Sequence, residues 1–261
     1  MKLTGNTIFI TGGGTGIGRG LAEALHKLGN KVIISGRRRQ QLDSVVAANP
    51  GIEAIELDVA DPESIRKVSA QLISRHPRLN VLINNAGIMI ADDAASAIDE
   101  KTLTSEIDEK TLTSEIEINL LGSIRLTSAL VEHLKQQKDA TILYNSSTLA
   151  FTPLARYAVY SATKAALHSY ALSQRFQLRN SPVKVQEIAP PWVGTGLVGA
   201  ADDPRTVPLD RFIEGTLAAL ATDAEEILVE EAKIFRNNAG AGEHVFVNEL
   251  NTMMAKELAT L

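Results

Sequence analysis

Tyr160 and Lys164 are the pair of residues whose types and spacing suggest chemistry most directly. Residues four apart lie on one face of a helix, so the phenol and the ammonium are expected to be neighbours. A free phenol has a pKa of about 10, and a nearby ammonium favours the phenolate and lowers that pKa. A tyrosine adjusted in this way can give a proton to a carbonyl oxygen or take one from an alcohol. Such pairs are common on helices, so the interpretation depends on their partners.

A glycine-rich turn, residues 11–18, stands between the first expected strand and the first expected helix. Glycine permits positive φ angles and close backbone approach, and a helix N-terminus offers free N–H groups to a pyrophosphate. The alternative is a tight strand-to-helix turn without a ligand. Its place in a βαβ unit favours dinucleotide binding instead. The expected contacts are Gly12, Gly14, Thr15, Gly16, Ile17 and Gly18.

Basic residues follow the second expected strand, which ends at Ser35-Gly36. NAD-dependent enzymes usually place a carboxylate there, on the ribose 2′-hydroxyl. This sequence has Arg37, Arg38 and Arg39 instead, and a guanidinium suits a 2′-phosphate. We therefore predict NADP(H) rather than NAD(H), with Arg37 as the contact. The alternative, a solvated basic start to the next helix, describes at least Arg39.

Several motifs, spread over about residues 3–197, resemble the short-chain dehydrogenase/reductase family. They are the turn spacing Gly12-x-x-x-Gly16-x-Gly18, the run Asn84-Asn85-Ala86-Gly87, and Tyr160-Ser161-Ala162-Thr163-Lys164. The resemblance implies a catalytic tetrad of Asn119, Ser147, Tyr160 and Lys164. In this scheme Ser147 orients the substrate oxygen, Asn119 interrupts its helix and helps to hold a relay water, and Lys164 also holds the nicotinamide ribose.

The same resemblance implies further cofactor contacts, at Asp58, Val59, Asn85, Ala86, Gly87, Pro190, Val193 and Thr195. The sequence departs from the family where Pro190-Pro191 replaces Pro-Gly. Proline lacks an N–H and excludes positive φ, so the backbone there is expected to be stiffer. The Pro-Pro pair, the opening residues 1–7 and the run 163–168 are similar to the DltE-like branch of the family.

The resemblance implies an NADP(H)-dependent oxidoreductase that moves hydride between nicotinamide and a ketone, aldehyde or secondary alcohol, with Tyr160 as general acid and base. A non-catalytic dinucleotide-binding sensor or scaffold is the alternative, because fold alone does not fix function. A third alternative is a relative that acts as an epimerase or dehydratase, but those enzymes are usually longer than this chain. Residues 192–208 are expected to form a substrate loop or lid beside the cofactor. Trp192 is either a pocket wall or simple packing.

Short apolar runs alternate with helical patterns along the chain. Strands are expected over 7–10, 31–35, 52–57, 81–83, 141–144, 183–188 and 227–229. Helices are expected over 18–28, 40–48, 62–74, 114–136, 157–178 and 209–221, the third capped by Asp61 with Pro62 in its first turn. Apolar parallel strands joined by helices must be covered on both faces. The pattern predicts one α/β domain over 1–261, a Rossmann-type doubly wound parallel sheet flanked by helices.

Composition excludes several classes of function. The chain has no cysteine and five scattered histidines, so we expect no metal. Its net charge of -5 gives no basic footprint for nucleic acid. No apolar stretch could span a membrane and no secretion signal opens the chain, so a cytoplasmic location is expected. The resemblance implies a homodimer and leaves a tetramer open.

Residues 98–106 are repeated at once as residues 107–115. Nine residues advance about two and a half helical turns, so both copies cannot bury the same stripe of one straight helix. We expect the second copy to keep the register of the helix that runs on to Asn119. The first copy would then be an added loop or a separate turn. A tolerated surface insertion and a change in site access or subunit contacts both stay open.

Overall fold

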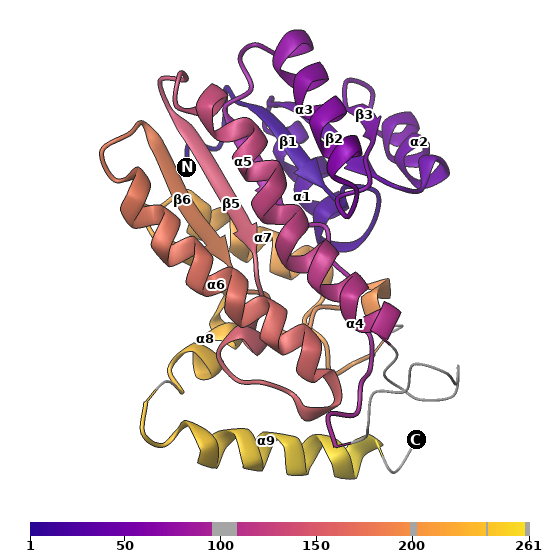
Figure 1. The fold of residues 1–261 in the computed structure, drawn as a ribbon, viewed down its shortest axis with the longest axis vertical. Coiled ribbons are helices and arrows are strands. Elements are labelled where there is room, and N and C mark those ends of the chain that lie inside the picture. Colours follow the sequence, from indigo (N-terminus) through magenta and orange to yellow (C-terminus); the bar gives the residue numbers. More distant parts are fainter. Residues whose placement is uncertain (96–108, 199–202, 239, 259–261) are drawn as a thin grey trace.

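The structure is a computed structural model that describes residues 1–95, 109–198, 203–238 and 240–258 (Figure 1). The described residues form a seven-stranded parallel sheet in the order β3-β2-β1-β4-β5-β6-β7. The strands are β1 Thr7–Thr11, β2 Lys31–Gly36, β3 Glu53–Glu56, β4 Val81–Asn84, β5 Ala140–Asn145, β6 Val183–Ile188 and β7 Glu226–Ile227. The predicted doubly wound parallel sheet is confirmed.

Nine α-helices lie within the described ranges. They are α1 Gly16–Lys27, α2 Arg39–Ala48, α3 Pro62–Arg75, α4 Glu109–Glu115, α5 Gly122–Leu134, α6 Ala158–Leu178, α7 Leu209–Leu220, α8 Glu230–Arg236 and α9 Glu243–Leu258. A π-helical segment, Ile116–Leu121, joins α4 to α5. Short 3-10 turns lie at Thr148–Ala150, Ala155–Tyr157 and Gly196–Val198.

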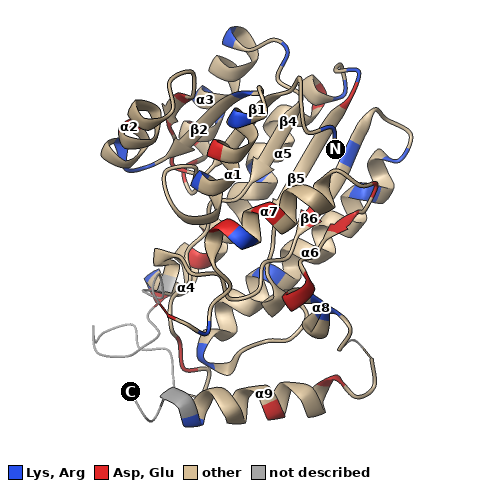
Figure 2. Ribbon diagram, turned by 180° about the vertical axis from the view of Figure 1, so that it is seen from behind, with Lys and Arg blue, Asp and Glu red and all other residues tan. Residues whose placement is uncertain are grey.

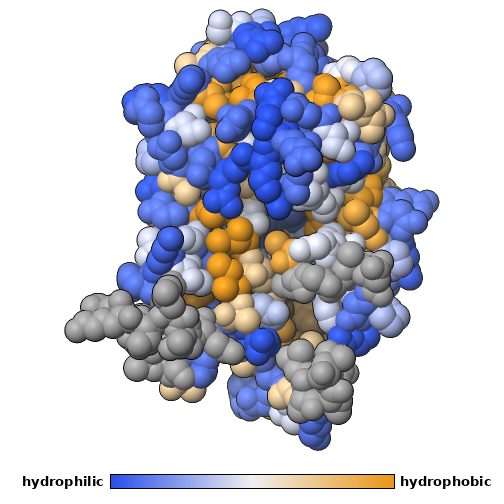
Figure 3. All heavy atoms as spheres, turned by 90° about the vertical axis from the view of Figure 1, so that its right-hand side faces the viewer, coloured by the Kyte–Doolittle hydropathy of each residue, from blue (hydrophilic) through white to orange (hydrophobic). Residues whose placement is uncertain are grey.

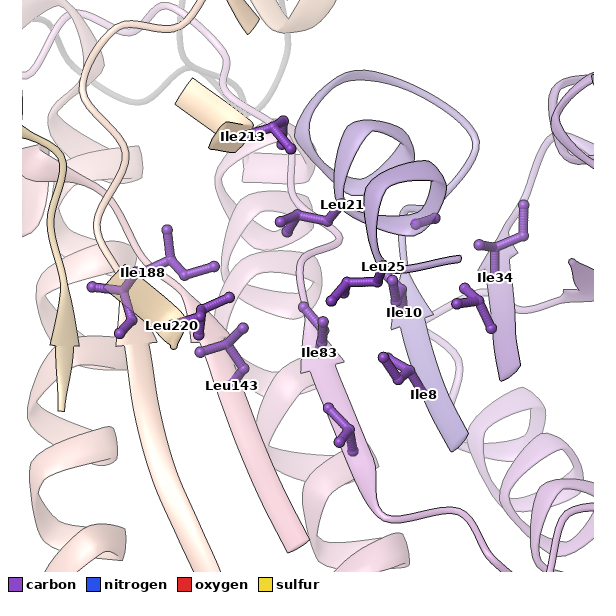
Figure 4. Close-up of a cluster of buried hydrophobic side chains, with 14 of the residues drawn as sticks. Ile8, Ile10, Leu21, Leu25, Ile34, Ile83, Leu143, Ile188, Ile213 and Leu220 are labelled. Carbon is purple, nitrogen blue, oxygen red and sulfur yellow. The ribbon is translucent and has the colours of Figure 1, made fainter. Parts of the chain in front are cut away.

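Two apolar layers cover the faces of the sheet. One packs Leu21 and Leu25 of α1 and Ile213 of α7 against strand residues such as Ile10 (Figure 4). The other packs α3, α5 and α6 against the opposite face, around residues such as Phe9. Strand residues alternate between the two layers, which explains why Ile8, Phe9 and Ile10 of β1 are all apolar.

The strand order reverses between β1 and β4, which both pair with neighbours in the centre of the sheet. In an open α/β sheet, ligands bind at this reversal, outside the carboxyl ends of the strands. The loops after β1, β4 and β5 meet at that edge. They carry the glycine turn, the run Asn85-Ala86-Gly87 and Ser147, while Asn119 lies in the π-helical segment and Tyr160 and Lys164 lie on α6.

The predicted helix over 114–136 is divided, and the C-terminal region differs from the prediction. A π-helical segment separates α4 from α5. The prediction of a single helix in the last quarter is wrong, because α8 and α9 follow α7. Both lack a clear apolar stripe: Ile234 of α8 and Val245 and Met253 of α9 are exposed. Hydrophobic periodicity therefore gives no signal for them.

The repeated segment is described only in part. The second copy is helical from Glu109 onward and leads through the π segment into α5, while its expected α-helical register as far as Asn119 is interrupted by that segment. The first copy, residues 98–106, lies outside the described residues, so its expected loop or turn stays a prediction. Glu115, the last residue of the second copy, is buried.

Charged residues of both signs are interspersed along the ribbon (Figure 2). None of the described helices is long and apolar enough to cross a lipid bilayer.

Candidate active site

Tyr160 and Lys164 lie on the buried face of α6, 6% and 3% exposed. The Lys164 ammonium donates a hydrogen bond to the backbone oxygen of Asn145, at 2.8 Å. It lies 5.4 Å from the centroid of the Tyr160 ring. Helix spacing therefore places the amine beside the phenol, as expected, at the carboxyl end of β5.

Ser147 follows β5 and caps a 3-10 turn, where its hydroxyl accepts a hydrogen bond from the Leu149 N–H at 3.1 Å. The same side chain hydrogen-bonds the phenol of Tyr160, which favours the phenolate. Ser147 and Tyr160 thus meet through their side-chain oxygens. A carbonyl oxygen could be held between these two groups.

Asn119 lies in the π-helical segment and is fully buried. Its amide makes two hydrogen bonds of 2.8 Å with the backbone of Ile88, one donated and one accepted. Its nitrogen also lies 3.3 Å from the Thr163 hydroxyl on α6. A Cβ on Gly87 would lie 3.2 Å from the Asn119 amide oxygen and 3.6 Å from the Lys164 nitrogen. The structure therefore brings Asn119, Tyr160 and Lys164 to one place, and the interruption expected at Asn119 is a π turn, a device common at functional sites.

The expected lowering of the Tyr160 pKa is wrong for this structure. Burial raises that pKa to about 12, and the nearby Glu115 carboxylate adds to the rise. Burial also lowers the pKa of Lys164 to about 8, although Glu187 and Glu115 both favour its charged form. Loss of hydration outweighs the attraction between neighbours, a balance that helix spacing alone does not reveal.

Two buried carboxylates escaped the sequence analysis. Glu115 and Glu187 are each 1% exposed, and both act on Lys164. Burial raises the pKa of Glu115 to about 7, and Asp92 adds to the rise. Glu187 lies in the mixed run Val183–Ile188, beside Lys184 and Gln186, so no local pattern marks it as buried.

The glycine turn has the shape of a phosphate cradle. Gly12 and Gly16 have φ angles of +67° and +53°, which side chains other than glycine rarely adopt. A Cβ on Gly18 would lie 2.4 Å from the Gly12 oxygen. Thr15 caps α1 without a side-chain hydrogen bond, and the first turn holds no acid. Free N–H groups and positive helix dipole therefore remain for an anion.

Asn85 ties the strand ends together. Its side chain donates to the Thr11 oxygen at 2.8 Å and accepts from the Asn145 amide at 2.7 Å. The Thr11 hydroxyl accepts from the N–H groups of Asn85 and Ala86, each at 2.9 Å. This segment therefore supports the sheet through bonds across β1, β4 and β5.

The three arginines after β2 are all exposed. Arg39 pairs with Asp43 one turn along α2, at 2.8 Å. Among the described residues, Arg37 and Arg38 form no ion pair. Arg37 therefore keeps its guanidinium available at the end of β2, where the prediction places it.

Asp58 and Val59 follow β3 in the predicted place. The Asp58 carboxylate accepts from the Ala60 N–H at 2.9 Å, which fixes the loop. Val59 is buried, and its backbone oxygen would lie 2.6 Å from a Cβ on Gly122. The start of α5 therefore crosses this loop closely.

The beginning and the end of the segment 192–208 after β6 lie side by side. Val193 pairs with Val207 in an isolated bridge, and the Val207 N–H donates to the Trp192 oxygen at 2.8 Å. The Arg205 guanidinium lies 4.9 Å from the Trp192 ring centroid, so this tryptophan packs at least against its own loop. Thr195 lies across from the glycine turn, its Cβ 3.5 Å from the place of a Cβ on Gly16.

Pro190 and Pro191 start this segment. Pro190 is buried, and its oxygen accepts from the Thr148 N–H at 2.9 Å, next to Ser147.

Figure 3 shows a hollow across the middle of one face, where hydrophobic surface is gathered between hydrophilic regions.

Within the described residues, one group of side chains joins a histidine to two carboxylates: His168, Glu187 and Glu226, with ligand-type atoms within 4.8 Å of one another. These atoms already have partners. His168 binds Glu187 at 2.7 Å, and Arg236 binds Glu226 at 2.7 and 3.0 Å. The guanidinium supplies the positive charge, so the group is an ion-pair network.

Known proteins match both the sequence and the fold. The profile of the family described as short chain dehydrogenase matches residues 6–206. The uncharacterized oxidoreductase DltE of Bacillus subtilis is 37% identical over 257 residues, which cover 97% of this chain and 99% of that protein.

Solved structures agree. A short chain dehydrogenase from Burkholderia cenocepacia in complex with NADP has a TM-score of 0.81 and 25% identity, covering 96% of this chain and 99% of its own. The 3-ketoacyl-(acyl-carrier-protein) reductase from Brucella melitensis, complexed with NADH, has a TM-score of 0.74 and 24% identity, covering 85% and 93%.

A parallel α/β sheet with a glycine cradle at its central reversal defines the class of Rossmann-type proteins. Within that class, this chain belongs to the short-chain dehydrogenase/reductase family of oxidoreductases. The predicted resemblance, including its DltE-like branch, is confirmed.

Proposed function

We propose that the protein is an NADP(H)-dependent reductase of ketones or aldehydes that can also run as an alcohol dehydrogenase. The observation that carries this proposal is the meeting of Ser147, Tyr160 and Lys164 at the end of β5. The two hydroxyls can hold a carbonyl oxygen, and the buried amine stands behind the phenol. The cofactor supplies or accepts the hydride.

Burial sets the direction in which Tyr160 acts most readily. Because its pKa is raised to about 12, the phenol is protonated at neutral pH. It is then ready to donate to a carbonyl oxygen on which negative charge develops, while Ser147 orients that oxygen. The charged form of Lys164 assists by attracting the phenolate that remains. We therefore expect carbonyl reduction to dominate at neutral pH.

The residues of the cradle fit a dinucleotide. The places of the absent Cβ atoms on Gly12 and Gly18 lie within 3.0 Å of protein atoms, so backbone packs tightly around the turn. Its free N–H groups would hold the pyrophosphate, with Gly14, Thr15, Gly16 and Ile17 along the same turn. Arg37 would bind a 2′-phosphate, which favours NADP(H) over NAD(H). The similar NADP and NADH complexes support a nicotinamide cofactor in general.

The remaining contacts follow the shape of the crevice. Asp58 and Val59 would flank the adenine, and Asn85, Ala86 and Gly87 would line the middle of the cofactor. Pro190, Val193 and Thr195 would meet the nicotinamide. Residues 192–208 would close over the substrate. Lys164 would reach the nicotinamide ribose as well as the phenol.

A substrate panel tests the proposal. Oxidation of NADPH and NADH is followed at 340 nm with a range of ketones and aldehydes, and dinucleotide binding is measured by calorimetry. Tyr160→Phe should reduce turnover about 10²–10⁴-fold while dinucleotide affinity is kept. Tyr170→Phe is the matched control, because Tyr170 lies on the same helix and packs edge-on against Tyr144.

Two results would contradict the proposal. Full activity of Tyr160→Phe would remove the phenol from the mechanism. Dinucleotide binding without turnover of any substrate would favour a sensor or scaffold.

The same proposal includes a homodimer formed through α5 and α6. Leu172 and Phe176 of α6 are exposed, 43% and 66%, which is unusual for large apolar side chains on one helix. Light scattering of the wild-type chain and of Leu172→Asp tests this assembly. A monomeric wild-type protein would refute it.

A further inference from the structure

Glu187 is a buried carboxylate that the proposed chemistry does not use. It is 1% exposed within β6 and has two hydrogen-bond partners. The Ser146 hydroxyl donates to one of its oxygens, and Nδ1 of His168 lies 2.7 Å from the other. Burying a carboxylate is costly even when it is paired. The position of Glu187 therefore calls for a reason beyond packing.

Three consecutive residues at the end of β5, Asn145 to Ser147, each hold a different group of the site. The backbone oxygen of Asn145 accepts from Lys164, the hydroxyl of Ser146 donates to Glu187, and the hydroxyl of Ser147 bonds Tyr160. A displacement of Ser146 would move both neighbours. Glu187 fixes the middle residue of the three from behind the site.

His168 makes the matching contact from the helix. It lies four residues after Lys164 on α6, hence on the same face. Its ring also packs edge-on against Phe151, with centroids 4.9 Å apart. Through Ser146 and His168, one carboxylate thus joins the strand end that carries Ser147 to the helix that carries Tyr160 and Lys164.

Charge gives Glu187 a second role. Of the groups that favour charged Lys164, Glu187 acts most strongly, ahead of Glu115. Its neighbour Glu226 has a cation of its own, Arg236. Glu187 forms its own ion pair only with His168 among the described residues, while Arg236 acts on it from a greater distance.

We propose that Glu187 is a positioning residue of the active site, which with His168 holds Ser147 and Lys164 in register and balances the charge of the buried Lys164 ammonium. The role rests on the proposed function, because it acts through the groups assigned there. It adds a buried carboxylate and a histidine behind the tetrad, neither of which touches the reacting atoms.

Several charged or titratable groups surround Lys164, and their effects on its pKa must be separated. Tyr160 faces it from its own helix, and Glu115 and Glu187 act on it from α4 and β6. Glu187 in turn faces His168, and beyond it the pair formed by β7 and α8, Glu226 with Arg236. Removing one carboxylate at a time shows whether the pKa of Lys164 depends on Glu187 itself or on the wider group of charges around it.

The first experiment reads Lys164 without any substrate. Protein carrying lysine labelled with ¹³C at the ε carbon is titrated by NMR, and the Lys164 signal is identified by its loss in Lys164→Arg. In Glu187→Gln the midpoint should move to lower pH by about one unit, since an opposite charge has been removed. Glu226→Gln is the matched control and should leave the midpoint within a few tenths of a unit.

The second experiment reads turnover. The alkaline limb of the pH profile for carbonyl reduction should move to lower pH in Glu187→Gln, parallel to the NMR midpoint. His168→Gln and Ser146→Ala keep the carboxylate and should lower kcat about tenfold, by loss of positioning, with a smaller shift of the limb. Glu187→Asp keeps the charge and should restore the limb, which excludes a purely structural effect.

The following results would contradict the proposed role of Glu187 or the proposed function. An unmoved Lys164 midpoint together with unchanged kcat in Glu187→Gln would overturn the proposal. If Glu187→Gln does not fold, an unchanged kcat in both His168→Gln and Ser146→Ala would overturn it. If the wild-type chain reduces no carbonyl, the proposed function fails, while the NMR midpoint still decides the charge role of Glu187.

Discussion

Glu115→Gln gives the sharpest test of the electrostatics of the site. Glu115 ends α4, is 1% exposed, and accepts a hydrogen bond from the Ile90 N–H at 2.9 Å. Burial is the main cause that raises the pKa of its carboxyl to about 7, with Asp92 adding to the rise and Lys164 opposing it. Glutamine has the same size and keeps an acceptor for that N–H. The substitution therefore removes charge and little else.

The raised pKa of Glu115 decides how the stability of the wild-type protein changes with pH. The neutral acid is favoured in the folded protein, so its contribution is complete below the unfolded pKa of 4.5 and is lost as pH rises through about 7. A rise of this size corresponds to a total contribution of about 3 kcal/mol to the free energy of unfolding. Most of this contribution is lost between about pH 5 and pH 7. From pH 5.5 to pH 8.5, wild-type protein should lose about 2 kcal/mol relative to Glu115→Gln.

Urea unfolding at the two pH values measures this difference. The free energies of unfolding of both proteins are compared at pH 5.5 and 8.5, with equal m-values as the check on two-state behaviour. Glu117→Gln is the control, because Glu117 lies two residues on, is less buried, and pairs with Arg125. If the difference between wild type and Glu115→Gln were the same at both pH values, the account of a buried, largely protonated Glu115 would be refuted.

Three further predictions concern the cofactor turn and the fold. Arg37→Ala should weaken NADPH binding about tenfold in calorimetry and leave NADH binding unchanged, whereas Arg39→Ala should affect neither; equal losses for both dinucleotides would speak against a 2′-phosphate contact. Gly18→Ala should lower the free energy of unfolding by about 1–3 kcal/mol, because its Cβ would meet backbone at 2.4 Å. Gly242→Ala, which has open space, is its control, and equal stability of the two variants would count against the tight turn. Asp61→Ala should cost about 1 kcal/mol through loss of the cap on α3, measured as a lower urea midpoint.

Local patterns in the sequence predict the sheet and most helices well. The predicted strand 183–188 matches β6 to the residue, with apolar residues at Val183, Val185 and Ile188. Asp61 with Pro62 marks the start of α3, where Asp61 accepts from the Glu63 N–H at 2.9 Å. The spacing of Tyr160 and Lys164 places both on one helix face. These signals depend on neighbours within a few residues, which is why they can be found without the structure.

Long-range burial is what the sequence does not reveal. The pKa of Tyr160 follows from the removal of water by several elements, so its direction was predicted wrongly. Glu187 and His168 are 19 residues apart and meet only when β6 packs beside α6. Likewise, α9 has no apolar stripe and is fixed in part by Asn251, whose side chain bonds Pro153 and Ala155.

The side chain of Asn85 connects the glycine turn after β1 to the end of β5. It grips the end of β1 through Thr11 and the end of β5 through Asn145, and Asn145 in turn holds the Lys164 ammonium. A displacement of the glycine turn would therefore reach the Lys164 amine through this one amide. With the dinucleotide and the proton donor proposed above, cofactor binding and proton donation would be coupled at Asn85, and a substitution that loosens this amide should weaken both.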